Sequence, residues 1–126
     1  MPSIRPPLVV RRIFNPIAMR FGIGGSMALA VAGRRSGRIH RVPVIPVTHD
    51  GARYLVSPRG ETDWVRNLRH SGTGRLNDEA FQATEIPTAD RAPIIAAYRS
   101  VAGRAVRSFF EQRPDAKDHP VFRIDV

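Results

Sequence analysis

The residues with the clearest capacity for chemistry form a short basic cluster in the first third of the sequence. Six of them fall within eight positions: Arg34, Arg35, Ser36, Arg38, His40 and Arg41. Guanidinium groups offer planar forks of donors that match phosphate and carboxylate. The backbone amides of a Gly-Arg-Arg-Ser-Gly turn can form a concave anion nest. The cluster therefore predicts an anion-binding site, with a merely solvated basic turn as the alternative.

Other kinds of reactive site are not indicated. The sequence has no cysteine, and its four histidines are scattered without the spacing of metal ligands. Ser36 lacks the G-x-S-x-G context of a nucleophile, and no P-loop or G-x-G-x-x-G fingerprint is present. We therefore predict no metal site and no certain catalytic residue. A chain with an anion site but no catalytic constellation suggests chemistry borrowed from a phosphorylated cofactor.

The charge balance also points to an anionic partner. The 126 residues carry a formal net charge of +9, and Lys117 is the only lysine, so arginine supplies nearly all of it. Nucleic acid, an anionic membrane and a phosphorylated cofactor are the candidate partners, beside a basic surface that reflects arginine-rich codon usage alone. No aromatic residue interleaves with the arginine cluster to make a stacking platform, so we expect no nucleic-acid partner.

The elements that must position the cluster are short strands. Residues 27–32 read as a buried strand, and the Gly-rich residues 33–37 as a turn. Residues 38–48 predict one strand, at a sheet edge or bulged, because Pro43 and Pro46 cannot donate to a ladder. His49-Asp50-Gly51 predicts a hairpin, with residues 53–57 as the return strand.

The second half predicts a loop at residues 58–62, then a helix over 64–70 capped by Thr62 or Asp63. A flexible link is expected at 71–74, and two strands at 75–76 and 81–86 around an Asn77-Asp78 turn. A helix from Pro87, broken or bent at Gly103, would then precede a last strand over 120–126. The apolar face of that helix would be formed by Ile94, Tyr98, Val101, Ala105 and Phe109.

These elements predict an α+β fold in one domain, residues 15–126, with about six mainly antiparallel strands closed into a small barrel and flanking helices. A helix is expected over residues 15–21. Residues 1–14 form a separate basic and apolar segment that suits peripheral contact with a membrane. No stretch has the ~20 apolar residues of a membrane span, so we expect a cytoplasmic protein, with membrane association through this segment as an option.

Several short motifs in order resemble one known family, the split β-barrel deazaflavin-dependent nitroreductases, which use the flavin analogue F420. The resemblance covers roughly residues 15–86, with weaker agreement at 119–122. Its motifs are Asn15-Pro16, G-R-R-S-G at 33–37, Arg41 with Pro43-Val44, Asp50-Gly51, S-P-R-G at 57–60, and W-x-x-N-L at 64–68. The chain departs from the family at Pro58, where members often have serine, and in a shorter loop after it.

The resemblance implies a split barrel that binds F420, with FMN or FAD as alternatives. The cofactor phosphate would lie on Arg35, Ser36, His40 and Arg41. The deazaflavin ring would lie over the loop formed by Val56, Ser57, Pro58, Arg59 and Gly60, with Arg59 as a candidate for an electrostatic role. Trp64 and Asn67 would shape the helix behind that loop, or only anchor it to the barrel.

The sequence leads to three hypotheses about the function. The first is an F420-dependent oxidoreductase that passes a hydride to a small acceptor, such as a quinone or a nitroaromatic. The second is a binding protein without turnover that holds a flavin, a deazaflavin or a lipid. The third, a nucleic-acid-binding domain, is disfavoured as stated above. The sequence leaves open whether the protein is a monomer or a homodimer.

Overall fold

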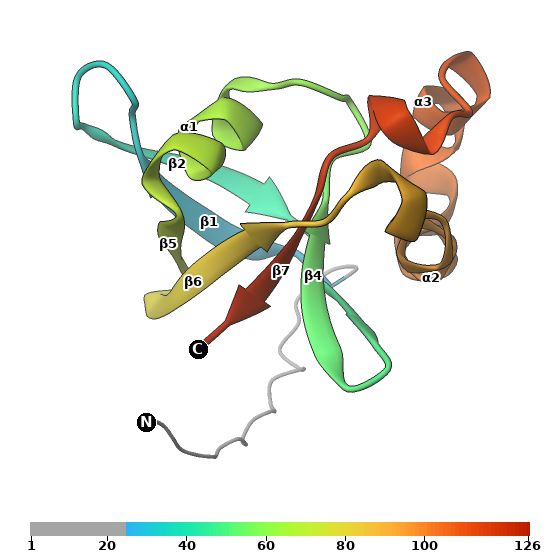
Figure 1. The fold of residues 1–126 in the computed structure, drawn as a ribbon, viewed down its shortest axis with the longest axis horizontal. Helices are drawn as coiled ribbons and strands as arrows, with labels where there is room; N and C mark the ends of the chain where they lie inside the picture. Colours follow the sequence, from blue (N-terminus) through green and yellow to red (C-terminus); the bar gives the residue numbers. More distant parts are fainter. Residues whose placement is uncertain (1–24) are drawn as a thin grey trace.

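The computed structural model describes residues 25–126, so the expected segment at 1–14 and the expected helix at 15–21 lie outside the described part. Residues 25–126 form one curled sheet with helices packed on it (Figure 1). The strands are β1 (Met27–Ala32), β2 (Ile39–Val44), β3 (Val47–His49), β4 (Ala52–Val56), β5 (Thr73–Leu76), β6 (Glu79–Glu85) and β7 (Val121–Asp125). The described residues also form three α-helices, named in chain order: α1 (Asp63–Ser71), α2 (Ala92–Ala102) and α3 (Arg107–Gln112). Short 3₁₀ turns lie at Thr88–Asp90, Gly103–Val106 and Ala116–Asp118.

The order of the strands explains why the sheet is curled. It runs β2-β1-β5-β6-β7-β4-β3, and every neighbouring pair is antiparallel. Its two edge strands, β2 and β3, are nevertheless joined in the chain by Ile45 and Pro46 alone. Two residues span only about 7 Å, so the two edges must approach each other. The result is an open half-barrel with flanking helices, which confirms the predicted split-barrel fold although the sheet does not close fully.

Seven strands are present in the described residues, where about six were expected. The predicted strand over residues 38–48 is in fact two strands, β2 and β3, separated at Ile45-Pro46. Proline has no amide hydrogen to donate to a ladder, and the chain crosses from one edge of the sheet to the other at this point. The predicted edge position of Pro43 is confirmed, because β2 is an edge strand.

Two apolar clusters cover opposite sides of the central strands. Leu55, Phe122 and Ile124 pack in the first cluster with Val65 and Leu68 of α1. The second cluster joins the sheet to α2 and α3 and consists of Val47, Val56, Ile94, Ile95, Tyr98, Val106, Phe110 and Val121. Neighbouring residues of a strand face opposite sides, so Val121 and Phe122 are both buried, but in different clusters.

The turns follow the sequence signals. Asp50 and Gly51 both have positive φ, at 50° and 79°, and connect β3 to β4 as a two-residue hairpin turn. Asn77 and Asp78, at 47° and 72°, do the same between β5 and β6.

The expected flexible link at 71–74 is wrong. Ser71 is still helical, Gly72 ends α1 in the left-handed conformation, and β5 begins at Thr73. Gly74 lies within this strand. A side chain is excluded at this position, because an added Cβ would lie 2.9 Å from the ring of Phe81.

The helical region after Pro87 is more broken than predicted. Gly103, at φ 61°, ends α2, which confirms the expected break. The change of direction exposes Val101 and Ala105 and buries Val106 and Phe110 instead. In the described part of the chain, no helix is both long and apolar enough to cross a membrane.

Candidate functional site

The curl of the sheet leaves a cavity between β2 and the end of β4. Its volume is about 1050 Å³, which is at the upper end of the range for small-molecule and cofactor sites. It is lined from four directions: the 33–37 loop, β2, the loop at residues 57–62, and α1 with α2. All of the predicted site residues except Gly60 line it: Arg35, Ser36, His40, Arg41, Val56, Ser57, Pro58, Arg59, Trp64 and Asn67.

The 33–37 loop is a tight connection between β1 and β2. The Gly33 amide donates to the Arg38 carbonyl at 2.7 Å, and the Gly37 amide donates to the Gly33 carbonyl at 3.0 Å. Gly37 has φ 75°, a conformation that glycine adopts without strain. The Ser36 hydroxyl accepts from the Arg38 amide at 3.1 Å. The loop is therefore held in shape by its own backbone.

Arg34 is the residue of this loop that is fixed most firmly to the body of the protein. Its amide and its Nη1 donate to Oδ1 of Asn67 on α1, at 3.0 and 2.8 Å. Its Nη2 lies 3.5 Å from Oδ1 of Asp63. Arg34 also lines the cavity. Asn67 thus joins α1 to the 33–37 loop, a contact that neither of its two predicted roles described.

Gly33 lets two polar side chains pack closely on the backbone. A Cβ added to Gly33 would lie 2.8 Å from Nε2 of His40 and 3.1 Å from Oγ of Ser36, so a side chain here would clash with both. His40 and Ser36 also line the cavity. Glycine at this position thus places an imidazole and a hydroxyl, two groups that can form hydrogen bonds, close together at the cavity wall.

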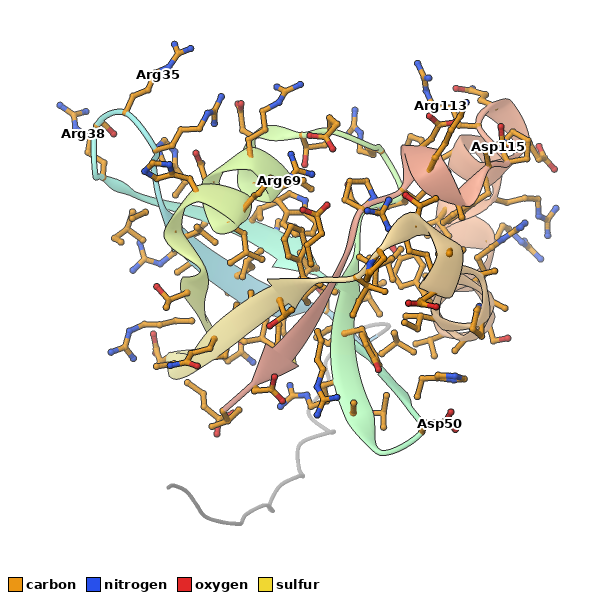
Figure 2. The ribbon with its side chains drawn as sticks, in the orientation of Figure 1. Arg35, Arg38, Asp50, Arg69, Arg113 and Asp115 are labelled. Atoms are coloured by element: carbon orange, nitrogen blue, oxygen red, sulfur yellow. The ribbon has the colours of Figure 1, made fainter. Side chains whose placement is uncertain are left out.

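The other basic residues take different positions. Arg35 and Arg38 extend from the loop (Figure 2), and only Arg35 of the two lines the cavity. His40 pairs in register with the buried Val31 and shares its face, whereas Arg41 pairs with Ala30 on the other face. Arg41 lines both the cavity and a second hollow behind the sheet. The alternation of side chains along β2 therefore separates His40 from Arg41.

The 57–62 loop contributes mainly backbone and apolar surface. Ser57 is fully buried, and its hydroxyl donates to the Gly60 carbonyl at 2.6 Å. Its amide donates to the Pro120 carbonyl at 2.9 Å, and its own carbonyl lies 3.0 Å from Nδ1 of His119. The polar groups of Ser57 thus have partners within the protein.

Gly60 faces away from the cavity. It has φ 87°, and an added Cβ would lie 3.2 Å from the Asp118 carbonyl oxygen. The open side that glycine leaves here is turned toward the Ala116–Asp118 turn. Arg59 stands at the rim of the cavity, with its guanidinium carbon 5.4 Å from the centre of the Phe109 ring.

Apolar side chains form the rest of the wall. Trp64 lines the cavity and also packs on the core, with its ring centre 6.2 Å from that of Phe122. Tyr98 of α2 lines the cavity beside Val106, and burial raises the pKa of its phenol to about 12. The Tyr98 hydroxyl therefore stays protonated at neutral pH.

Several lining residues were not predicted as site residues. They include Ile45, Thr62, Asp63, Tyr98 and Val106. The sequence predicts an apolar helix face that includes Tyr98, but no local pattern shows that this face meets a cavity.

Thr62 precedes α1 as a predicted cap, yet its side chain makes no capping bond. Its buried hydroxyl oxygen has no partner among the described residues. The same part of the chain holds no group of three or more potential metal-ligating side chains.

Comparison with known proteins gives a family match over most of the chain. The family model described as F420H(2)-dependent quinone reductase matches residues 8–111. No curated protein matches the sequence.

Solved structures share the fold at low sequence identity. The protein Atu2129 (unknown function) from Agrobacterium tumefaciens aligns with a TM-score of 0.60 and 17% identity. That alignment covers 80% of this chain and 48% of the other, so this chain spans about half the length of that protein. An F420-H2 dependent reductase, FDR-A, aligns with a TM-score of 0.60 and 17% identity, covering 79% of this chain and 93% of that one. The heme storage protein HutZ from Vibrio cholerae has a TM-score of 0.60 and 14% identity, over 79% and 80%. These likenesses support the split-barrel fold.

Proposed function

The chain belongs to the F420H(2)-dependent quinone reductase family, and we propose that it is an oxidoreductase that passes a hydride from reduced F420 to a small acceptor. The acceptor classes that we propose are quinones and nitroaromatics. The observation that carries the proposal is the cavity of about 1050 Å³, which joins an arginine-rich loop to an apolar wall. A cofactor with a phosphate and a flat ring requires that combination.

The residues around the cavity fit F420. His40 and Ser36 pack together over Gly33 and line the cavity. Arg35 of the same loop and Arg41 of β2 also line it and offer the cationic donors that a phosphate needs. The buried Thr62 hydroxyl, which has no partner in residues 25–126, offers a further polar contact beside α1.

When bound, reduced F420 supplies the hydride. The protein's part is to bind, orient and exclude water. Val56, Pro58 and Trp64 would form the apolar surface for the ring, and the guanidinium of Arg59 at the rim would stabilise negative charge as it develops. Holding Arg59 against Phe109 keeps this charge at a fixed place.

The test is a fluorescence titration with F420, FMN and FAD under identical conditions, followed by turnover of reduced F420 with menadione. We expect F420 to bind most tightly and to be oxidised in the presence of the quinone. Binding of F420 without turnover would favour the non-catalytic alternative, a flavin-, deazaflavin- or lipid-binding protein. Tighter binding of FMN or FAD would contradict the cofactor assignment.

Two further properties are proposals of their own. Peripheral contact with anionic lipid is proposed for residues 1–14, which combine Arg5, Arg11 and Arg12 with apolar side chains. Deletion of residues 1–12 should then lower co-sedimentation with anionic liposomes without a large change in melting temperature.

The proposed oligomeric state, monomer or homodimer, can be decided by light scattering at several concentrations.

A further inference from the structure

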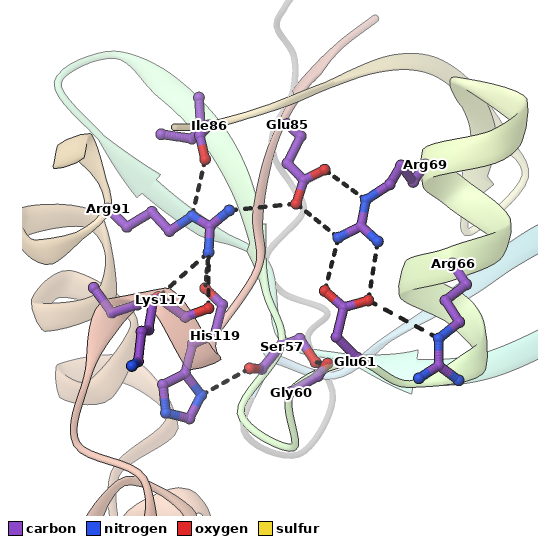
Figure 3. Close-up of polar contacts among 11 residues, drawn as sticks. Ser57, Gly60, Glu61, Arg66, Arg69, Glu85, Ile86, Arg91, Lys117 and His119 are labelled. Atoms are coloured by element: carbon purple, nitrogen blue, oxygen red, sulfur yellow. Dashed lines mark hydrogen bonds and ion pairs between the residues drawn. The ribbon is translucent and has the colours of Figure 1, made fainter. Parts of the chain in front are cut away.

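Behind the 57–62 loop lies a continuous ion-pair network (Figure 3). Arg69 of α1 donates from Nη1 and Nη2 to the two carboxylate oxygens of Glu61, at 2.9 and 2.8 Å. The same guanidinium donates from Nε and Nη2 to the two oxygens of Glu85, at 2.7 and 2.9 Å. Arg91 extends the network, with its Nη2 3.3 Å from Oε2 of Glu85. One planar group thus joins the loop, through Glu61, to the end of β6.

Arg91 connects the network to the segment before β7. It is only 7% exposed, and its Nε donates to the Ile86 carbonyl at 2.8 Å. Its Nη1 lies 3.3 to 3.5 Å from three carbonyl oxygens, those of Ala116, Lys117 and His119. The network therefore holds the segment at 116–119 through Arg91, as it holds the 57–62 loop through Glu61.

The other end of the loop is tied to that same segment. Ser57 exchanges hydrogen bonds with Pro120 and His119. Residues 58 and 59, which line the cavity, lie between this attachment and the attachment of Glu61 to Arg69. Arg66 of α1 also approaches Glu61, with its Nε 4.0 Å from Oε1. None of the five network residues lines the cavity itself.

Exposed ion pairs usually add little stability, and the Glu61 and Arg69 side chains are 47% and 42% exposed. Their value here lies in geometry, because a doubly bidentate arginine admits few arrangements of its partners. The Arg69 guanidinium also lowers the pKa of Glu61, so the carboxylate stays ionised at neutral pH. The interaction is therefore present under the conditions in which the enzyme would work.

We propose that Arg69 is a positioning residue, which holds the 57–62 loop through Glu61 so that Pro58 and Arg59 face the cofactor at a fixed distance. This inference rests on the proposed function. If so, the two loops control different quantities: the 33–37 loop determines the affinity for the cofactor, and the network determines the rate of hydride transfer.

The variant that tests it is Arg69→Gln, with Arg123→Gln as the matched control. Arg123 on β7 also forms an exposed ion pair, to Asp125 at 3.2 Å, with a side chain that is 50% exposed. Both variants lose one positive charge at a similar exposure. A second test variant, Glu61→Gln, removes the same contact from the loop side and leaves the Arg69–Glu85 pair in place.

Three quantities are measured for each variant: the Kd for F420, the single-turnover rate with menadione, and the hydrogen exchange of the Gly60 and Thr62 amides, which donate to the Ser57 and Gly60 carbonyls. For Arg69→Gln we expect the rate to fall by about tenfold or more, since small misplacements are costly in catalysis. The Kd should change less than about threefold, because the phosphate donors are on another loop. Exchange in the loop should quicken by about tenfold. Arg69→Lys, which keeps the charge but not the planar fork, should leave the rate low.

Unchanged exchange of the loop amides in both Arg69→Gln and Glu61→Gln would overturn the inference, as would an equal loss of rate in Arg123→Gln. The exchange measurement needs no cofactor. If the wild-type protein fails to oxidise reduced F420, the proposed function fails, and the exchange comparison still decides whether Arg69 fixes the loop.

Discussion

The side-chain oxygen of Asn67 accepts two hydrogen bonds from Arg34, one from the backbone amide and one from the guanidinium. Asn67 is 4% exposed on α1, and Arg34 belongs to the loop that carries two of the four arginines lining the cavity. Helix and loop are thus joined through a single buried acceptor. The position of the anion-binding loop against α1 depends on a residue 33 positions later in the chain.

Replacing Asn67 should release this loop. In Asn67→Ala the Arg34 amide loses its partner, and we expect the free energy of unfolding to fall by about 1–3 kcal/mol. Binding of F420 should weaken by about tenfold, since Arg34 is no longer held at the cavity. Asn67→Asp keeps an acceptor oxygen and should lose less of both. Chemical denaturation and fluorescence titration measure the two effects, and equal affinity in wild type and Asn67→Ala would contradict the expectation.

The predicted phosphate donors can be separated from the general basic surface. Arg35→Ala and Arg41→Ala should each weaken F420 binding by about tenfold, because a hydrogen bond to a charged group contributes about 1.5–3 kcal/mol. Added salt should reduce wild-type affinity as well. Arg38→Ala is the control, since Arg38 belongs to the same exposed cluster but does not line the cavity. A loss as large in Arg38→Ala would mean that total charge, rather than position, governs binding.

Gly60 should tolerate a side chain poorly for a reason other than contact with the ring. At φ 87°, alanine is strained by about 1–2 kcal/mol, and its Cβ would also press on the Asp118 carbonyl. Gly51 has a similar φ of 79° with nothing within 4 Å, so Gly51→Ala carries the strain alone. We expect Gly60→Ala to lower the melting temperature more than Gly51→Ala does. The reverse order would contradict the contact with Asp118.

The buried phenol of Tyr98 predicts a change of stability in alkali. Its pKa is about 12 in the folded protein, whereas an unperturbed tyrosine ionises near about 10. The unfolded chain therefore loses this proton first, and stability falls as the pH rises from about 10 toward 12. In Tyr98→Phe this part of the alkaline loss should vanish. Denaturation curves at several pH values, with Tyr54→Phe as the control, test this directly.

The strands and turns were predictable because they depend on local signals. Asp50-Gly51 and Asn77-Asp78 specify hairpin turns, and Gly103 indicated the break after α2. Pro46 indicated a disturbed strand, but where the chain went after it could not be inferred. That depends on the closure of the whole sheet, which no local pattern contains.

The candidate site was predictable in part. The motifs of the 33–37 and 57–62 loops identified residues that do meet at one cavity, although the two loops follow different strands. The orientation of Gly60 was not predictable, since it depends on the Ala116–Asp118 turn far along the chain. The same applies to Tyr98, Val106 and the Arg69 network, which arise only when α1, β6 and α2 are packed together.

The central place of β7 has a consequence for the order of folding during synthesis. This strand pairs with β6 on one side and β4 on the other, yet it is made after every other described strand. Until Val121–Asp125 leave the ribosome, the nascent chain holds a sheet of β2, β1, β5 and β6 and a separate β3–β4 hairpin, with their inner edges unpaired. Such edges are prone to mispairing and aggregation. We therefore expect the nascent protein to rely on chaperones until the last strand arrives, and stalled chains that lack it to be insoluble.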